Sequence, residues 1–183
     1  MNRAYLDRLL SWVGVVLTLV LLAGGVLALI GRNYADSQVQ HQLVQEKVTF
    51  PPKGSPGLDP KEFPGLQKYA GQPVDTGTKA EAYADQFIWV HMMSASGGKT
   101  YAEVANEAQA NPNDPKLQGL KQTLFQGDML RSSLLTAYAF SRFGLVALWA
   151  AIALFAGAVL MAILTVLGFL HASRVAREPV PQR

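Results

Sequence analysis

Hydrophobic positions gather in two long stretches, residues 9–30 and 143–170, with a long polar segment between them. Each stretch reaches the roughly 20 apolar residues that an α-helix needs to cross about 30 Å of hydrocarbon. Neither stretch contains Asp, Glu, Lys or Arg. The pattern predicts an all-α membrane protein in which two transmembrane helices enclose one sizeable helical domain, residues 31–142.

The polar segment has helical periodicity on both sides of a central loop. Asp36 to Val48 places apolar residues on one face, so we expect the first helix to continue beyond the membrane as a stalk until Phe50-Pro51-Pro52 ends it. Two further helices are predicted, over Thr78 to Ser96 and over Lys116 to Arg142. The apolar positions that carry these three predictions are Val39, Leu43, Val48, then Ala80, Tyr83, Ala84, Phe87, Ile88, Met92, and finally Leu117, Leu120, Leu124, Met129, Leu130, Leu134 and Leu135.

Two short motifs separate the last two helices. Gly97-Gly98 stops the helix before it, and Thr100-Tyr101-Ala102-Glu103 has the sequence of a capping box. A short helix to about Ala110 should follow, and Asn111 to Pro115 should form a turn.

The segment from Phe50 to Gly77 is rich in proline and glycine but also contains Phe63, Leu66 and Tyr69. A plain linker has no need of such side chains, so we predict an ordered loop that wraps the domain and leaves aromatic residues exposed for contact. Asp59-Pro60 is typical of a helical N-terminus and predicts one helical turn.

Charge predicts the orientation. The net charge of +3 belongs to the two tails, which hold Arg3, Arg8, Arg174, Arg177 and Arg183 against Asp7 and Glu178, while acidic and basic residues balance in residues 31–142. Positive residues beside a span resist translocation. We therefore expect a plasma-membrane protein with cytoplasmic tails at residues 1–8 and 171–183 and an extracytoplasmic domain between the spans. No nucleic-acid partner is implied.

The first span has two interpretations. A charged start before an apolar run is also typical of a cleaved signal peptide, but this run is longer than the usual signal core. Ala28-Leu29-Ile30-Gly31 does not match a small-x-small cleavage site, which favours an uncleaved signal anchor. The chain has no cysteine, which excludes disulfides and thiolate-metal sites.

One histidine lies in a setting that could bind a metal. The sequence His91-Met92-Met93 offers imidazole and thioether ligands suited to Cu(I). Methionines on a helix are more often core residues, and a lone histidine is more often solvated. His41 and His171 stand without such neighbours, and we predict no metal site and no cofactor.

Catalytic motifs are also missing. The sequence has no His-Glu-x-x-His and no Gly-x-Ser-x-Gly, and Gly97-Gly98-Lys99-Thr100 lacks the earlier glycine of a P-loop. The carboxylates of Asp75, Glu81 and Asp85 are explained by the start of a helix, where negative charge is favourable. We therefore predict no catalytic residue and no enzyme.

The spans themselves lack the ionisable groups that a proton or ion path would need, which argues against a transporter that acts alone. Small residues at fourfold spacing would let helices approach closely. They could serve either the pairing of the two spans or contact with a partner's helix. These residues are Gly24, Ala28, Ala147, Ala151, Ala153 and Gly157.

Four segments, QEKVTFPP (45–52), FPGLQKYAGQPV (63–74), KAEAYADQFIWVH (79–91) and KTYAE (99–103), resemble a family of uncharacterised two-span membrane proteins of actinobacteria. The resemblance covers the chain from the first span to the end of the second. It implies the cell envelope of a high-GC Gram-positive organism, and it implies no activity, ligand or catalytic residue.

The function predicted from the sequence is that of a non-enzymatic accessory subunit or assembly factor of an envelope membrane complex. Membrane lipids and a protein partner are the expected contacts. A first alternative is an extracytoplasmic small-molecule sensor that signals through a partner; a pocket lined by Phe87, Trp89 and Tyr101 would favour it. A second is a surface enzyme acting on lipid or cell-wall precursors; convergence of Asp85, His91 and Glu103 would favour that.

Overall fold

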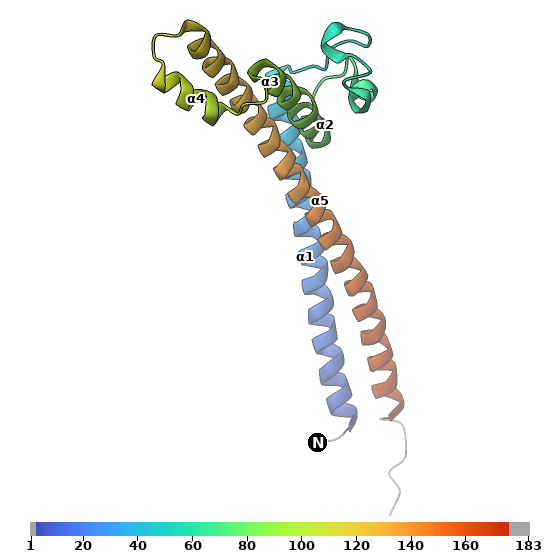
Figure 1. The fold of residues 1–183 in the computed structure, drawn as a ribbon. Coiled ribbons are helices and arrows are strands. Elements are labelled where there is room, and N and C mark those ends of the chain that lie inside the picture. Colours follow the sequence, from blue (N-terminus) through green and yellow to red (C-terminus); the bar gives the residue numbers. More distant parts are fainter. Residues whose placement is uncertain (1–2, 176–183) are drawn as a thin grey trace, which may run out of the picture. The chain divides into compact units, whose positions relative to one another are not determined.

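The computed structural model describes residues 3–175. Two long helices, α1 (Arg3–Glu46) and α5 (Pro115–Val175), begin and end this part of the chain (Figure 1). In residues 3–175, β-pairing is limited to an isolated bridge between Thr49 and Pro73, so the prediction of a helical protein is confirmed there. The shorter elements between the long helices are the 3-10 helices η1 (Pro56–Leu58) and η2 (Pro64–Tyr69), then α2 (Gly77–Ala82), the π-helical η3 (Tyr83–Ile88), α3 (Trp89–Ser96) and α4 (Tyr101–Ala110).

Within the described residues two compact units are present, one formed by residues 3–33 with 144–175 and one by residues 34–143. We call them the span unit and the domain. Of the predicted C-terminal tail, residues 176–183 lie outside the described part of the chain, whereas residues 171–175 continue α5.

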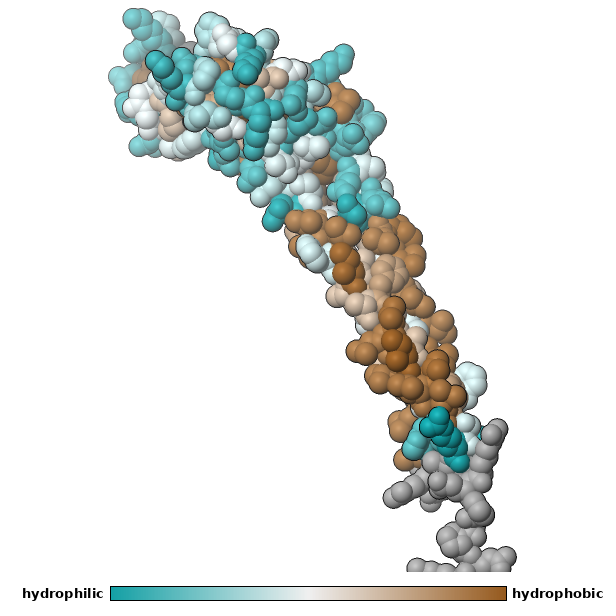
Figure 2. Space-filling model, turned by 90° about the vertical axis from the view of Figure 1, so that its right-hand side faces the viewer, coloured by the Kyte–Doolittle hydropathy of each residue, from teal (hydrophilic) through white to brown (hydrophobic). Residues whose placement is uncertain are grey.

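Each long helix contains a segment that is long and apolar enough to cross a membrane. In the most hydrophobic window of each, only 11% and 17% of the residues are buried, unlike the core helix of a soluble protein. Figure 2 shows a continuous hydrophobic surface on these segments. The side chains that form it are suited to contact with lipid.

The two helices of the span unit pack antiparallel through small residues. A Cβ at Gly25 would lie 2.8 Å from the ring of Phe155, and a Cβ at Gly168 would lie 2.6 Å from Ser11 Oγ. On α5 the buried positions recur every seven residues, as in a coiled-coil seam. They are Gly144, Ala151, Ala158, Thr165 and Ala172.

Of the small residues singled out in the sequence, most lie at or beside this seam. Gly24 faces Leu154, Gly157 faces Leu21, and Ala151 is buried, while Ala153 is exposed. The close approach of the two helices therefore accounts for Gly24, Ala151 and Gly157, but not for Ala153.

Within the domain, α1 buries Val39 and Leu43, as their spacing predicts. The helix ends at Glu46, four residues before the Phe50 that was expected to end it. Lys47 takes a left-handed conformation with φ 52°, which turns the chain out of the helix before the prolines are reached. The helix that was expected to reach Val48 is therefore two residues shorter, and Lys47 ends it before Phe50-Pro51-Pro52 is reached.

The Pro-rich segment is ordered, but its aromatic side chains turn inward. Residues 48–51 pair with residues 71–74 through backbone hydrogen bonds, among them Phe50 N–H to Gln72 O at 2.9 Å and Val74 N–H to Val48 O at 2.9 Å. The expectation of exposed aromatic residues is wrong here, because the fold uses them to build the core. The buried side chains are Phe50, Leu58, Phe63, Leu66 and Val74, with Tyr69 half-buried.

Asp59 organises a single turn in this segment, as its position before Pro60 predicts. Its carboxylate accepts from Lys61 N–H at 2.7 Å, and its carbonyl accepts from Phe63 N–H at 2.8 Å. The neighbouring 3-10 helices η1 and η2 were not predicted.

Residues 77–96 are helical throughout, close to the predicted helix from Thr78. Thr76 caps its start by accepting from Lys79 N–H, and the π-helical stretch η3 inserts an extra residue that shifts the direction of later side chains. Gly97 ends α3 at φ 65°, with Gly98 N–H bonded to Met93 O at 2.7 Å. This is the glycine stop that the sequence indicates.

The capping box at α4 is confirmed, since Thr100 and Glu103 bond each other's backbone amides. Asp114 caps α5 by accepting from Lys116 N–H at 2.9 Å and Leu117 N–H at 3.1 Å. Both caps satisfy amides that a helix start leaves free.

Residues 77–96 pack closely on α5. Gly77 lies against Ser141, and a Cβ at Gly127 would lie 2.6 Å from Met92 Sδ. The core that results contains Val39, Leu43, Ile88, Val104, Leu124 and Leu134 together with the buried residues of the Pro-rich segment.

Candidate functional site

The exposed face of α5 in the domain is bordered by two grooves. Because α5 buries Leu124 and Leu134, the residues about half a turn away face outward. Met129, one of the apolar positions that predict this helix, is one of them, with 57% of its surface exposed. It lies five residues after Leu124, which takes it out of the three-and-four spacing of the buried face.

The first groove, which we call the uncharged groove, has a volume of about 600 Å³ and lies between α1 and α5. None of its lining residues is ionised at neutral pH. Its walls repeat at spacings of three and four along both helices. They consist of Tyr34, Ala35, Gln38, Val39 and Gln42 of α1 and Met129, Ser132, Ser133, Thr136, Ala137 and Phe140 of α5.

The second groove, which we call the aromatic groove, has a volume of about 630 Å³ and lies on the other side of the same α5 residues. Met129, Ser132 and Thr136 border both grooves and form a ridge between them. The remaining lining residues of the aromatic groove are Tyr101, Phe125, Asp128, Arg131, Leu135 and Ala139.

An aromatic pair and an arginine distinguish the aromatic groove. The rings of Tyr101 and Phe125 lie 5.7 Å apart, and Phe125 remains 43% exposed. The guanidinium of Arg131 is held by an ion pair to Asp85 at 2.7 Å and lies over the ring of Trp89 at 4.9 Å. An arginine held on two sides loses little further freedom when it binds a partner.

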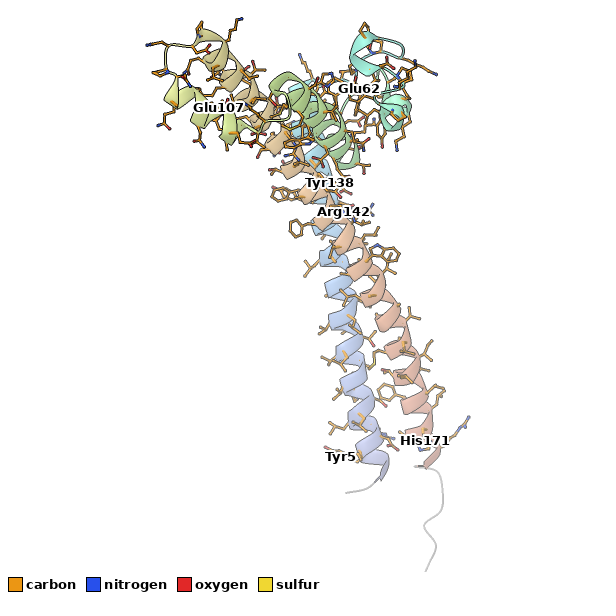
Figure 3. The ribbon with its side chains drawn as sticks, in the orientation of Figure 1. Tyr5, Glu62, Glu107, Tyr138, Arg142 and His171 are labelled. Carbon is orange, nitrogen blue, oxygen red and sulfur yellow. The ribbon has the colours of Figure 1, made fainter. Side chains whose placement is uncertain are left out.

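A polar cluster joins α2 to α5. Tyr138 and Arg142 lie one turn apart on α5, with Arg142 5.9 Å from the Tyr138 ring (Figure 3). A hydrogen bond to the Glu81 carboxylate raises the pKa of Tyr138, because it favours the protonated phenol. Burial raises the pKa of Tyr83. The hydrogen bond between Tyr138 and Glu81 connects α5 to α2, and none of these groups lines either groove.

The His91-Met92-Met93 sequence does not assemble a ligand set. The His91 ring stacks on Phe63 at 5.2 Å, and its Nδ1 lies 2.8 Å from Phe87 O. Met92 is buried against Gly127, on another side of the helix. In the part of the chain that the structure describes, no three His, Cys, Asp or Glu side chains gather as a metal site would need.

The carboxylates considered as acid or base groups have structural contacts. Asp75 pairs with Lys79 at 2.9 Å, Asp85 pairs with Arg131, and Glu81 bonds Tyr138. Glu103 is held in the capping box, where hydrogen bonds from Thr100 lower its pKa. His41 approaches Gln45 at 3.4 Å, and His171 lies 3.9 Å from Asp7.

The structure does not bring together either of the two residue sets whose convergence would favour an alternative function. Asp85, His91 and Glu103 each have separate neighbours and share no groove. Phe87 packs on Tyr83 and Phe63, whereas Tyr101 lines the aromatic groove, so these residues and Trp89 do not line one pocket.

Sequence reasoning missed both grooves. The available signal was the exposed series Phe125, Met129, Thr136 and Phe140, which runs along α5 out of phase with its buried leucines. A helix with a second apolar stripe is typical of one that packs on two sides.

These features define a class: an all-helical protein with two membrane-length helices and a helical domain inserted between them. Comparison with protein-family models, curated proteins and solved structures finds no match for this chain. The resemblance to the actinobacterial family stays a prediction.

Proposed function

We propose that this chain is a two-pass membrane protein that acts as a non-enzymatic accessory subunit or assembly factor of a cell-envelope complex. In this proposal the aromatic groove binds another membrane protein. The resemblance to actinobacterial two-span proteins supports an actinobacterial plasma membrane as its setting.

The topology rests on charge. The positive residues of the two tails, including Arg8 and Arg174, favour cytoplasmic termini. The domain, in which acidic and basic residues are equal in number, can be translocated to the outer side of the membrane. The first span then acts as a signal anchor. Since the chain has no native cysteine, a single cysteine introduced at Gln109 or at Ser173 shows on which side of the membrane that position lies. A membrane-impermeant maleimide applied to intact cells should label Gln109→Cys and leave Ser173→Cys unlabelled, and the reverse labelling would overturn the orientation.

The observation that carries the proposed function is the chemistry of the aromatic groove. Tyr, Arg, Met and Phe are enriched at protein interfaces, and hot-spot residues are often Tyr or Arg. Here Tyr101, Phe125, Met129 and Arg131 line one groove, with the arginine already held by Asp85 and Trp89. The groove is open and shallow, as suits a side chain or helix of a partner.

A non-enzymatic role is supported by the same contacts that define the fold. The carboxylates of Asp85 and Glu103 and the imidazole of His91 serve an ion pair, a helix cap and a ring stack. A general acid or base must instead reach a substrate.

Capture from native membranes tests the proposal. The full-length tagged chain, solubilised in mild detergent, should retain a membrane protein that is identified by mass spectrometry and that captures this chain in the reciprocal experiment. Phe125→Ala should abolish this capture, because it removes the exposed ring of the groove, and Asp128→Lys should weaken it by reversing a charge at the wall.

Phe140→Ala is the matched control, since Phe140 is 56% exposed on the same helix but lines only the uncharged groove. It should leave capture unchanged. Equal loss for Phe125→Ala and Phe140→Ala, or a chain that is monodisperse without any reciprocal partner, would overturn the proposed function.

A further inference from the structure

The uncharged groove differs from the aromatic groove in the partner that it suits. Its polar side chains are Tyr34, Gln38, Gln42, Ser132, Ser133 and Thr136, and charged residues are missing from its lining. Amide and hydroxyl groups can both donate and accept hydrogen bonds. A surface of this kind can bind an identical surface, because each amide or hydroxyl group can form a hydrogen bond with the same kind of group on the second copy.

The two grooves also differ in charge, which affects whether a second copy or a different protein can bind. When two copies meet about a two-fold axis, the same patch is present on both sides, so charged residues near the axis face like charges. Selectivity for a different protein usually involves charged pairs. The aromatic groove has Asp128 and Arg131 for such pairing, whereas the uncharged groove imposes no repulsion on a second copy.

The uncharged groove also has a ridge beside it. The ridge of Met129, Ser132 and Thr136 stands directly beside the uncharged groove. In a two-fold contact the ridge of one copy can enter the groove of the other, and the reverse contact follows by symmetry. The spacings of three and four on both walls match the ridges-into-grooves packing of helices, and residues 129–140 extend over roughly 16 Å at 1.5 Å per residue.

We infer that the uncharged groove is the contact surface of a homodimer, in which two copies pack α5 against the α1–α5 groove about an axis along the membrane normal. This inference rests on the proposed two-span topology, which holds both copies parallel in one membrane, and is independent of the partner proposed for the aromatic groove. Confinement to the membrane raises the effective concentration and allows a contact of modest size to form.

Disulfide trapping in native membranes provides the test, because the chain has no native cysteine. Ser132→Cys lies on the ridge, and Thr123→Cys is the matched control, exposed on the opposite face of the same helix nine residues away. Disulfides form only when the two Cα atoms come within about 7 Å. Oxidation should give a band of twice the chain mass for Ser132→Cys and leave Thr123→Cys monomeric.

A second pair tests the ridge-in-groove geometry. Two differently tagged chains, one carrying Gln38→Cys and the other Thr136→Cys, should form a mixed disulfide when co-expressed. Thr136→Lys in a Ser132→Cys background should reduce the trapped dimer about tenfold, since it brings two like charges together, whereas Thr123→Lys should not. Near-ultraviolet circular dichroism verifies that each variant is folded.

Three results would overturn the inference. One is trapping that is equal at Ser132 and Thr123 or missing at both. Another is a Gln38→Cys adduct with a different protein, which would make the groove a second heteromeric site, because Gln38 lines only the uncharged groove. The third is a monomer that carries a lipid in native mass spectrometry. Because Phe125→Ala should leave the dimer intact, failure of the dimer and failure of the proposed function are distinguishable.

Discussion

Replacing Gly77 with alanine tests the tightest packing between α2 and α5. The new Cβ would overlap both Oγ and Cβ of Ser141 and lie 3.4 Å from Tyr138 Cα. Rotation of the Ser141 side chain can move its hydroxyl, which donates to Tyr138 O at 2.7 Å, but cannot move its Cβ. The α2 helix must therefore shift away from α5.

The expected magnitude follows from two opposing effects. Overpacking of a well-packed contact costs about 1–3 kcal/mol, and a contact with two overlapping atoms belongs in the upper half of that range. Alanine regains at most about 1 kcal/mol of helix propensity. The free energy of unfolding of the domain should thus fall by about 1–2 kcal/mol, which lowers Tm by roughly 5–10 °C for a domain of this size.

The domain's own transition can be followed by the fluorescence of Trp89. The chain has three tryptophans, so Trp12→Phe and Trp149→Phe leave Trp89 as the single emitter in the full-length protein. Gly119→Ala is the control, because Gly119 is helical on α5 and a Cβ there meets nothing within 4 Å. That change should stabilise by about 0.5–1 kcal/mol.

Ser141→Gly added to Gly77→Ala should recover most of the lost stability, since it removes the atoms that clash. Independent sites would show no such recovery. If Gly77→Ala raises Tm as Gly119→Ala does, the close approach of α2 to α5 is refuted.

The remaining predictions concern pH and the span unit. The folded-state pKa of Glu103 is below its ordinary value of 4.5, so the stability that its carboxylate contributes is present above pH 4.5 and is lost as the pH falls through the folded pKa. Glu103→Gln should therefore reduce the loss of unfolding free energy at acid pH, measured by urea unfolding over a pH series. The pKa of Tyr138 is raised above its ordinary 10.0, so the stability that its phenol contributes is present below pH 10.0 and is lost as the pH rises through the folded pKa. Tyr138→Phe should therefore reduce the loss of unfolding free energy at alkaline pH, and an unchanged loss would contradict the Glu81 hydrogen bond. Gly14→Leu should separate the two spans, because the Gly14 surface lies against Thr165, and should lengthen the distance between spin labels at Tyr5 and Ser173. Gly31→Leu, with nothing within 4 Å of its Cβ, should not.

Local signals in the sequence located most helix boundaries. The capping box of Thr100 and Glu103, the stop at Gly97 and the turn before Pro115 all depend on neighbours within a few residues. Such interactions are similar in a peptide and in a fold. The end of α1 was misplaced because Lys47 adopts a left-handed conformation that few non-glycine residues take.

Burial was harder to predict where it depends on distant residues. Phe63 is buried because the Pro-rich segment folds back beside residues 83–91 and stacks on His91, a contact between residues far apart in the chain. Met129 looks apolar enough for the core, yet the phase of α5 turns it outward. The candidate site could not be predicted for the same reason, since each groove combines α5 with residues from another helix or from a different turn.

By itself the sequence determined the helical class, the two membrane-length segments, the capping box of α4 and the glycine stop of α3. Hydrophobic length and local hydrogen bonding are properties of short stretches of chain, so these needed no tertiary information. The tertiary structure decided which small residues bring the spans together, that the aromatic side chains of the loop turn inward, and that α5 presents a ridge between two grooves. These features depend on register and phase between helices, which are set only when side chains from distant segments pack against each other.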